Sequence, residues 1–203
     1  MNRTMALIAG CLLSVTSLGA NAQSPAVALQ MDSGFYVGAG LGRSEARDFC
    51  TIVAGACDAK DMSWNVYAGY QFNRHFALEG GFTNFGQATS SGFSGGVPSK
   101  ISTDTTAFEL VAVGLLPFTD RFSLFGKAGF FRYDSDGTIS GGVVAGASDT
   151  GTEFTFGLGA EYGFARNLAA RLEWQRYLGV GSGLLGLPKA DISVLRLGAR
   201  YKF

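Results

Sequence analysis

The last thirteen residues of the chain alternate between two kinds of side chain, and this alternation constrains the fold more than any other feature of the sequence. Successive side chains of a β-strand point to opposite faces. One face of the segment 191–203 is apolar and carries Leu195, Leu197, Ala199, Tyr201 and Phe203. The other face is largely cationic and carries Val194, Arg196, Gly198, Arg200 and Lys202. The end of the chain therefore predicts a strand with an apolar outside, a charged inside and a terminal aromatic residue.

Seven earlier segments alternate in the same way. They span residues 34–44, 63–72, 76–85, 103–116, 122–133, 152–164 and 168–177. In the clearest of them, the face that holds Phe154 and Phe156 carries no charge, whereas Glu153 and Glu161 lie on the opposite face. Strands of this kind favour a barrel whose apolar surface faces lipid. A soluble barrel of the lipocalin type would invert the pattern, with charges outside and apolar side chains inside.

The connections between these segments alternate in length. Three are short and cover residues 73–75, 117–121 and 165–167. Four are long and cover residues 45–62, 86–102, 134–151 and 178–190. Short turns on one side of the membrane, long loops on the other and an even number of strands are typical of bacterial outer-membrane barrels. The sequence thus predicts an all-β fold, an eight-stranded antiparallel up-and-down transmembrane β-barrel.

The start of the chain has the features of a secretory signal peptide. A positive residue, Arg3, precedes an apolar run that ends near Leu18, and a small-x-small cleavage site follows at 20–22. The run falls short of the ~20 residues that a transmembrane helix needs. A lipoprotein signal at Cys11 is an alternative, although the apolar run continues past that cysteine. We expect export through the Sec pathway, with a signal peptide at 1–22, a short leader at 23–32 and a barrel at 33–203.

Composition agrees with an exported membrane barrel. Charged residues make up 16% of the chain, below the ~25% of soluble domains. The formal net charge is zero, so no electrostatic argument favours nucleic acid as a partner. The mean hydropathy of +0.19 is too low for a helical membrane protein. It suits strands in which only alternate residues meet lipid.

Five short stretches, taken in order, resemble the OmpA-like transmembrane domain, the eight-stranded barrel shared broadly with proteins of the OmpX/Ail type. The stretches are 34–42 (GFYVGAGLG), 69–73 (GYQFN), 78–81 (LEGG), 170–175 (ARLEWQ) and 201–203 (YKF). The resemblance covers the whole chain after the signal peptide and implies an integral protein of the Gram-negative outer membrane. Because Phe203 ends the chain, we expect that the peptidoglycan-binding domain that follows the barrel in OmpA proper is absent.

The resemblance also implies that inward ion pairs plug the lumen. The matching positions hold Glu79, Lys127, Glu161 and Arg171, with Glu173 on the same inward face. Consecutive strands carry Glu161 and Arg171, so we expect these two side chains to meet directly, while Glu79 reaches across the narrow lumen. Val113 departs from relatives that carry a lysine there, so the network need not be the same.

Motifs for catalysis are weak. The single histidine, His75, lies in a predicted short turn. Residues 92–96 fit the G-x-S-x-G pattern but lie in a predicted loop, without the strand-turn-helix context of that motif. Residues 134–137 resemble part of a calcium loop, lack the later ligands and predict a turn. The inward carboxylates Glu161 and Glu173 are more simply explained as partners of cations. We expect no enzyme, no cofactor and no metal site.

The favoured function is that of a structural and surface-interaction protein, with a host or phage ligand bound at the four outer loops. A small or gated porin-like channel is the alternative, and an outer-membrane enzyme is a third interpretation. Eight strands enclose an interior that side chains just fill, which favours the first of these functions. Ion flux through the refolded barrel would separate the first two.

Two cysteines remain once the signal peptide is removed. Cys50 and Cys57 both lie in the first predicted outer loop. The periplasm is oxidising, so a disulfide is expected between them. Two free thiols are the alternative.

Two further sets of residues predict contacts with the envelope. Arg43, Arg132 and Arg176 fall on the lipid-facing register at the outer ends of their strands. Guanidinium groups at that height would bind lipopolysaccharide phosphates, although rim residues solvated by chance are the alternative. In the last strand, Tyr201 and Phe203 are the expected assembly signal for the barrel-assembly machinery.

Overall fold

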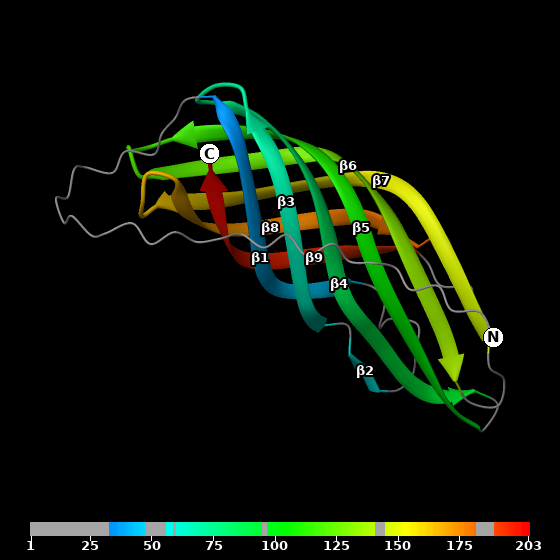
Figure 1. Cartoon of the computed structure of the whole chain (residues 1–203). Coiled ribbons are helices and arrows are strands. Elements are labelled where there is room, and N and C mark those ends of the chain that lie inside the picture. The colour runs from blue at the N-terminus through cyan, green and yellow to red at the C-terminus, as the bar shows by residue number, and fades with distance from the viewer. Residues whose placement is uncertain (1–32, 48–55, 59, 95–96, 141–144, 182–188) are drawn as a thin grey trace, which may run out of the picture.

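The computed structural model describes residues 33–47, 56–58, 60–94, 97–140, 145–181 and 189–203. Its strands pair antiparallel with their neighbours (Figure 1). They are β1 (Gly34–Arg47), β2 (Ala56–Asp58), β3 (Lys60–Gln71), β4 (Phe76–Ser94), β5 (Val97–Pro117), β6 (Phe122–Ser140), β7 (Ala145–Gly163), β8 (Leu168–Val180) and β9 (Ala190–Lys202). No helix formed by the described residues is long and apolar enough to cross a membrane.

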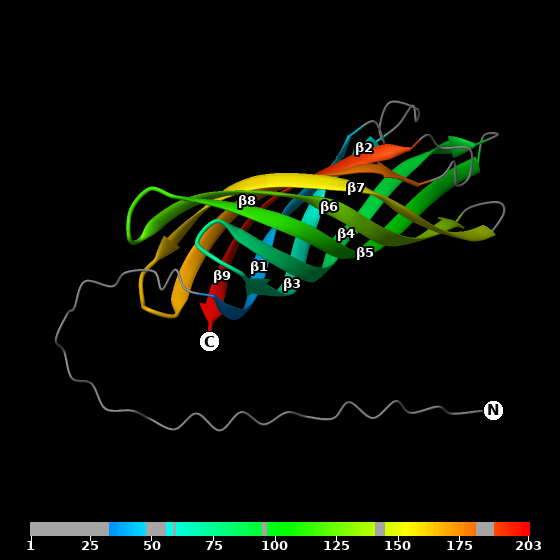
Figure 2. The ribbon, with the colours of Figure 1, turned by 90° about the horizontal axis from the view of Figure 1, so that it is seen from above.

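Eight of these strands close into a barrel (Figure 2). The order around it is β4-β3-β1-β9-β8-β7-β6-β5, and the pairing of β5 with β4 completes the ring. The short β2 lies outside this ring and pairs with β4, from Ala56↔Ser91 to Asp58↔Thr89. The last strand, β9, lies between β8 and β1 and joins the two ends of the sheet. The closed antiparallel barrel predicted from the alternation is confirmed.

Each of the eight barrel strands divides its described side chains between a surface and a lumen, as the alternation predicted. On β9, Leu197 is 64% exposed, whereas the neighbouring Arg196 is 3% exposed. On β1, Phe35 is exposed and Tyr36 is buried. An apolar surface of this extent would drive association in water, whereas lipid solvates it. The outer surface is therefore lipid-facing, and the charged side chains of the membrane-embedded part of the strands lie inside.

Aromatic side chains gather at two heights on the lipid-facing surface. We call the end of the barrel with the three short turns the turn end, and the opposite end the wall end. The turn-end belt comprises Phe35, Tyr70, Phe72, Phe76, Phe118, Phe122, Tyr162, Phe164, Tyr201 and Phe203. The wall-end belt comprises Trp64, Phe82, Phe108, Phe130, Phe154, Phe156 and Trp174. On β7, Phe154 and Tyr162 are eight residues apart. With a tilt of about 40° this spacing gives roughly 20 Å, close to the ~25 Å apolar band of such barrels.

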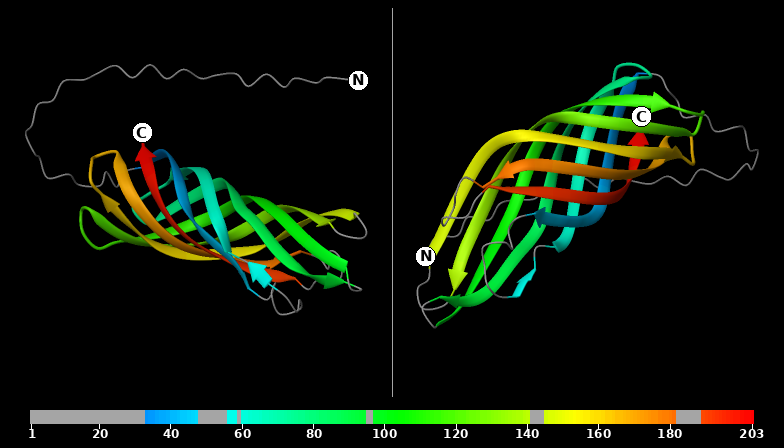
Figure 3. Two further views of the ribbon diagram at one scale, coloured as in Figure 1. Left: turned by 90° about the horizontal axis from the view of Figure 1, so that it is seen from below. Right: turned by 180° about the vertical axis from the view of Figure 1, so that it is seen from behind.

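Four adjacent strands are longer than the others and extend beyond the wall end (Figure 3). The strands β4 to β7 contain 19, 21, 19 and 19 residues, whereas β1, β3, β8 and β9 contain 14, 12, 13 and 13. We call this extension the outer wall; it consists of residues 85–94, 97–107, 133–140 and 145–153. Both of its faces lie beyond the lipid, so no apolar alternation marks it in the sequence. The prediction of long loops at 86–102 and 134–151 was therefore wrong for most of both segments.

Two motifs assigned to loops belong to strands. Residues 134–137, predicted as a turn, lie within β6, where Asp136 pairs with Asp104 of β5 and with Ser148 of β7. Part of the G-x-S-x-G stretch, 92–94, belongs to β4. The strand continues that far through a β-bulge at Gly86, whose φ is 78°.

Two reciprocal tyrosine–glycine pairs align β1 with β3 on the lumen face. Tyr36 lies opposite Gly69, and Gly38 lies opposite Tyr67. In each pair, a side chain added to the glycine would overlap the tyrosine ring. Each ring therefore occupies space that only a glycine on the neighbouring strand leaves free.

Several predictions fall outside the described part of the chain. Residues 1–32 and Cys50 are not described, and of Cys57 only the backbone is. The signal peptide, the leader and the disulfide stay predictions.

Candidate functional site

The centre of the lumen is an ion-pair network built around Glu173 of β8. Its carboxylate lies 2.9 Å from Lys127 Nζ and 3.2 Å from Arg196 Nη1 through Oε1, and 3.3 Å from Arg171 Nε through Oε2. The three cations come from β6, β9 and β8. One carboxylate thus joins three cations from three strands of the barrel.

Arg171 crosses the lumen from Glu173 to the opposite strands. Its Nη1 and Nη2 atoms donate to the two oxygens of Glu79 at 2.6 and 3.3 Å, a bidentate arrangement. The guanidinium carbon lies 4.0 Å from the ring centroid of Phe125 and 4.9 Å from that of Tyr67. Tyr36 Oη also donates to Glu79, at 2.9 Å. The Arg171 guanidinium is therefore surrounded by two carboxylates and by the rings of Phe125 and Tyr67.

A second carboxylate, Glu109, extends the network toward the wall end. Glu109 Oε1 lies 3.3 Å from Lys127 Nζ. Its Oε2 accepts from Gln175 Nε2 at 2.8 Å and from Tyr177 Oη at 2.7 Å. Arg196 Nη2 donates to Tyr177 Oη at 2.8 Å, so the hydroxyl both donates and accepts. The side chain of Glu109 is thereby held by three partners.

The expected contact between Glu161 and Arg171 is not present, and that part of the prediction was wrong. The two residues are register partners on β7 and β8, yet Glu161 Oε1 lies 2.6 Å from Arg200 Nη2 instead. Arg171 is turned toward Glu79, which it binds with both terminal nitrogens. The guanidinium of Arg200 lies 4.8 Å from the Tyr36 ring. Glu161 therefore adjoins the network through Arg200 and Tyr36.

The network is balanced in charge and packs beside two layers of buried apolar side chains. Ion pairs join four carboxylates to four cations: Glu79, Glu109, Glu161, Glu173, Lys127, Arg171, Arg196 and Arg200. A wall-side apolar layer consists of Phe85, Ala107, Phe131, Tyr133, Tyr177, Val180, Ile192 and Val194. A turn-side apolar layer consists of Tyr36, Tyr67, Ala77, Val111, Val113 and Phe125. A cavity of about 10 Å³ between Asn65, Tyr67 and Arg196 has room for about one water molecule.

The rim arginines fall into two environments. Arg43 and Arg132 are exposed, and Arg132 lies opposite Phe108 of the wall-end belt. Arg176 is half-buried and its Nη2 donates to Asp191 Oδ2 at 2.8 Å. All three lie at the height where the lipid-facing surface ends. At the other end, Tyr201 and Phe203 are exposed and their ring centroids are 5.2 Å apart.

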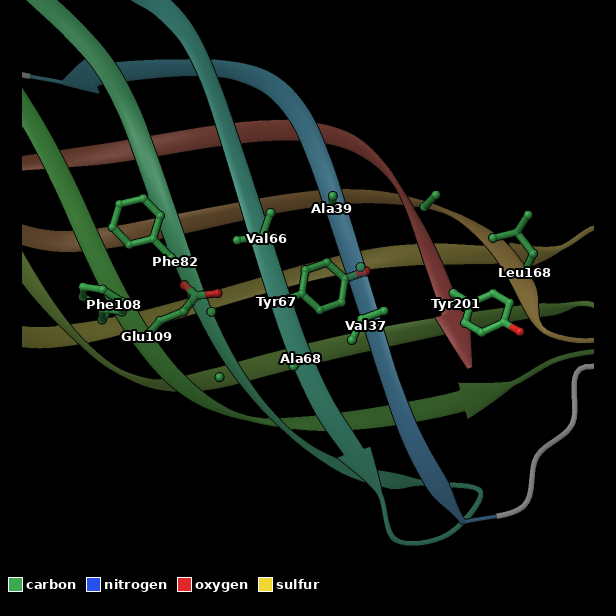
Figure 4. A pocket seen from close by; sticks show the side chains of 14 residues that line it. Val37, Ala39, Val66, Tyr67, Ala68, Phe82, Phe108, Glu109, Leu168 and Tyr201 are labelled. Carbon is green, nitrogen blue, oxygen red and sulfur yellow. The ribbon is translucent and has the colours of Figure 1, made fainter. Parts of the chain in front are cut away.

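A groove crosses the lipid-facing surface over β8, β9, β1, β3, β4 and β5 (Figure 4). Small residues, Ala39, Ala68 and Ala199 among them, separate the larger side chains along its length. Most of its lining faces lipid, although Tyr67 and Glu109 belong to the lumen face. The groove is thus a feature of the membrane-embedded surface, where acyl chains are the solvent.

Features of catalytic or metal sites are scarce in the described residues. His75 is exposed in the turn between β3 and β4, where its backbone N–H donates to Asn73 Oδ1 at 2.8 Å. Among the residues described, no group of three or more His, Cys, Asp or Glu side chains is placed to hold a metal ion.

The sequence analysis missed several members of the network. Alternation puts Tyr36, Glu109, Arg196 and Arg200 on the inward face, yet none of the four was assigned to the cluster. Alternation gives the face of a residue but not its height in the barrel, because height depends on how neighbouring strands are staggered. Val113, noted as a departure from some relatives, lies in the turn-side apolar layer.

A closed antiparallel barrel with an apolar surface, two aromatic belts and a charged lumen defines a transmembrane β-barrel of the outer-membrane class. The sequence matches the model of the family described as the OmpA-like transmembrane domain over residues 30–203, most of the chain. The chain belongs to this family and is an outer membrane protein of the Gram-negative envelope. The turn end is accordingly periplasmic and the outer wall is external.

Curated relatives are similar over the barrel. Outer membrane protein A of Yersinia pseudotuberculosis is 27% identical over 188 residues, which are 88% of this chain and 51% of the relative. Outer membrane protein A of Klebsiella pneumoniae is 29% identical over 187 residues, 85% of this chain and 52% of the relative. The chain spans about half the length of these relatives.

Solved structures support the fold. The attachment invasion locus protein Ail of Yersinia pestis has a TM-score of 0.56 and 18% identity, with 85% of this chain and 100% of that chain covered. Neisserial surface protein A has a TM-score of 0.55 and 17% identity, with 84% and 99% covered. At these identities the likeness concerns the architecture alone.

Proposed function

We propose that the protein is a structural and surface-interaction protein of the outer membrane, without enzymatic activity, whose lumen is plugged by inward ion pairs. The observation that carries this proposal is the balanced network of four carboxylates and four cations, all eight of them buried and packed beside two apolar layers. A pore needs a continuous path for water. The burial of all eight charged side chains supports a closed lumen.

Conductance tests the plug against the alternative of a small or gated channel. We expect the refolded wild-type barrel to carry no steady current in a planar lipid bilayer. A double variant, Arg171→Ala with Phe131→Ala, should conduct because it opens both the network and the wall-side apolar layer. Arg166→Ala, in an exposed turn, is the matched control. Steady current through the wild type would favour the channel.

The outer wall is the surface that we propose for interaction with an external ligand. Its outward face carries three exposed aspartates, Asp104, Asp134 and Asp136, beside polar residues. Ail of Yersinia pestis has been crystallised in complex with the heparin analogue sucrose octasulfate. The aspartates of this chain argue against a polyanion on that face, because like charges repel. The outer wall would therefore suit a neutral or cationic partner.

The rim arginines support a proposed contact with lipopolysaccharide. Arg43 and Arg132 are exposed at the edge of the apolar surface, where a guanidinium can bind phosphate in bidentate fashion. Arg176 would have to exchange its ion pair with Asp191 for such a contact. Alanine at all three positions should lower the melting temperature in lipopolysaccharide but not in neutral detergent. If the variant and the wild type melt at the same temperature in both media, the proposed contact with lipopolysaccharide is contradicted.

The last strand supports the proposal that the barrel-assembly machinery recognises Tyr201 and Phe203. Both rings are exposed on the lipid-facing side of β9, which is the strand that closes the barrel. A strand whose far edge still awaits β1 can pair transiently with another sheet.

A further inference from the structure

The three periplasmic turns repeat one construction. In each, a phenylalanine opens a five-residue segment, and its backbone N–H donates to the carbonyl of the fifth residue, at 2.9, 3.0 and 3.2 Å. The middle three residues of each segment include one arginine. The segments are Phe72-Asn73-Arg74-His75-Phe76, Phe118-Thr119-Asp120-Arg121-Phe122 and Phe164-Ala165-Arg166-Asn167-Leu168. The same device thus occurs at all three short connections of the barrel.

Backbone hydrogen bonds link each turn to the strand that follows in the ring. The carbonyl of His75 accepts from Leu115 N at 2.7 Å, and the carbonyl of Arg121 accepts from Gly163 N at 2.8 Å. The carbonyl of Asn167 accepts from Lys202 N, also at 2.8 Å. The first bond joins a turn to β5, the second to β7 and the third to β9. Each turn is therefore hydrogen-bonded to the neighbouring strand. These bonds hold the backbone from which each arginine side chain extends.

Side-chain caps hold two of the turns in shape. Asn73 Oδ1 accepts from the backbone N–H groups of His75 and Phe76, at 2.8 and 3.0 Å. Thr119 Oγ1 accepts from those of Arg121 and Phe122, at 3.3 and 2.9 Å. Such local bonds satisfy the turn with its own polar groups. The arginine side chains are left out of these caps.

The height of the arginines relative to the membrane follows from the aromatic rings beside them. Phe72, Phe118 and Phe164 are 56%, 62% and 53% exposed on the lipid-facing side. Aromatic belts of this kind mark the boundary between acyl chains and headgroups. Arg74, Arg121 and Arg166 follow two or three residues later and are exposed. A long cationic side chain at this height reaches the headgroups while its stem stays near the apolar boundary.

We propose that Arg74, Arg121 and Arg166 form a ring that binds the phosphate groups of anionic phospholipids in the periplasmic leaflet. Among the described turn residues, these three cations face one carboxylate, Asp120. Guanidinium is planar and binds phosphate with two parallel hydrogen bonds, which an ammonium group cannot do.

Lipid titration of the refolded full chain tests the ring. The protein in neutral detergent is titrated with dioleoylphosphatidylglycerol or dioleoylphosphatidylcholine, and native mass spectrometry gives the affinity for each. We expect a preference for phosphatidylglycerol that falls about fivefold for each arginine changed to glutamine, and roughly a hundredfold for all three. The triple lysine variant should keep part of the preference, since it keeps charge but loses the bidentate geometry.

Controls separate the ring from general charge effects. Lys60→Gln with Lys189→Gln removes exposed cations at the wall end and should leave the preference unchanged. If the triple glutamine variant fails to fold, the three single variants carry the test. An unchanged preference in folded arginine variants, or an equal loss in the wall-end control, would overturn the proposal.

Two further outcomes would also overturn it. Displacement of the lipid by inorganic phosphate, but not by chloride at the same ionic strength, would make the ring a site for free anions. Binding of the arginines to isolated peptidoglycan, without any preference for phosphatidylglycerol, would assign the ring to the cell wall instead of to lipid.

Discussion

The lumen network and the outer wall are both polar regions of the same strands, yet they use polarity in opposite ways. In the lumen, Glu173 and Arg171 are about 4% exposed, and each has charged partners at hydrogen-bond distance. On the outer wall, Asp104 and Asp136 face each other across β5 and β6 and are exposed. Buried charges must be paired, whereas water screens a like-charge pair. Substitution of a charged residue in the lumen should therefore lower the stability of the barrel much more than substitution of a charged residue on the outer wall.

Arg171→Ala should produce the largest difference between the two regions. It leaves Glu79 without its bidentate partner and removes one of the three cations around Glu173. Loss of one partner of a buried pair costs about 3–5 kcal/mol, because the other charge is stranded. Urea unfolding in phosphatidylcholine vesicles measures the change. Arg166→Ala, an exposed turn variant, should stay within about 0.5 kcal/mol, and equal effects of the two variants would contradict a buried network.

A pair of glycine variants should show a smaller difference. A methyl group at Gly38 would overlap the Tyr67 ring, so Gly38→Ala should destabilise the barrel by about 1–3 kcal/mol. On the outer wall, the nearest atom to a methyl group at Gly146 is Gly137 O, 3.9 Å away. Gly146→Ala should be neutral or stabilise by up to about 1 kcal/mol, since it restricts the unfolded chain. Unfolding midpoints in the same vesicles give both values, and a reversed order would refute the close packing of the lumen.

The smallest expected effect is a gain in stability on the outer wall. Asp136→Asn removes the like-charge pair with Asp104 and should stabilise the barrel by about 0.2–1 kcal/mol at low salt. High salt should abolish the gain, because exposed charges are screened. Asp134→Asn is the control, since Asp134 lies opposite Thr106 and Thr150. A gain that persists in high salt would have another cause.

The sequence predicted the membrane-embedded part of the fold and failed beyond it for one physical reason. Alternation is visible where one face of a strand meets lipid and the other meets a packed lumen, as at Phe154 and Thr155. On the outer wall the outward face meets water instead of lipid and carries Asp134 and Asp136, and residues 134–137 therefore looked like a turn. In the lumen, the inward face of Glu161 was predicted correctly, but its partner was not. Arg171 instead binds Glu79 and lies over the Phe125 ring, and Arg200 lies over the Tyr36 ring; strand periodicity reports none of these contacts.

The reciprocal tyrosine–glycine pairs of β1 and β3 favour one register of these two strands over the registers shifted by two residues. A slip of two residues keeps every side chain on its proper face, so hydrophobicity alone does not oppose it. In one direction such a slip would bring Tyr36 opposite Tyr67, two rings in the space of one. In the other direction it would set Gly38 against Gly69 and leave a hole. Both shifted registers of β1 and β3 are therefore less stable. In the native register each tyrosine lies opposite a glycine.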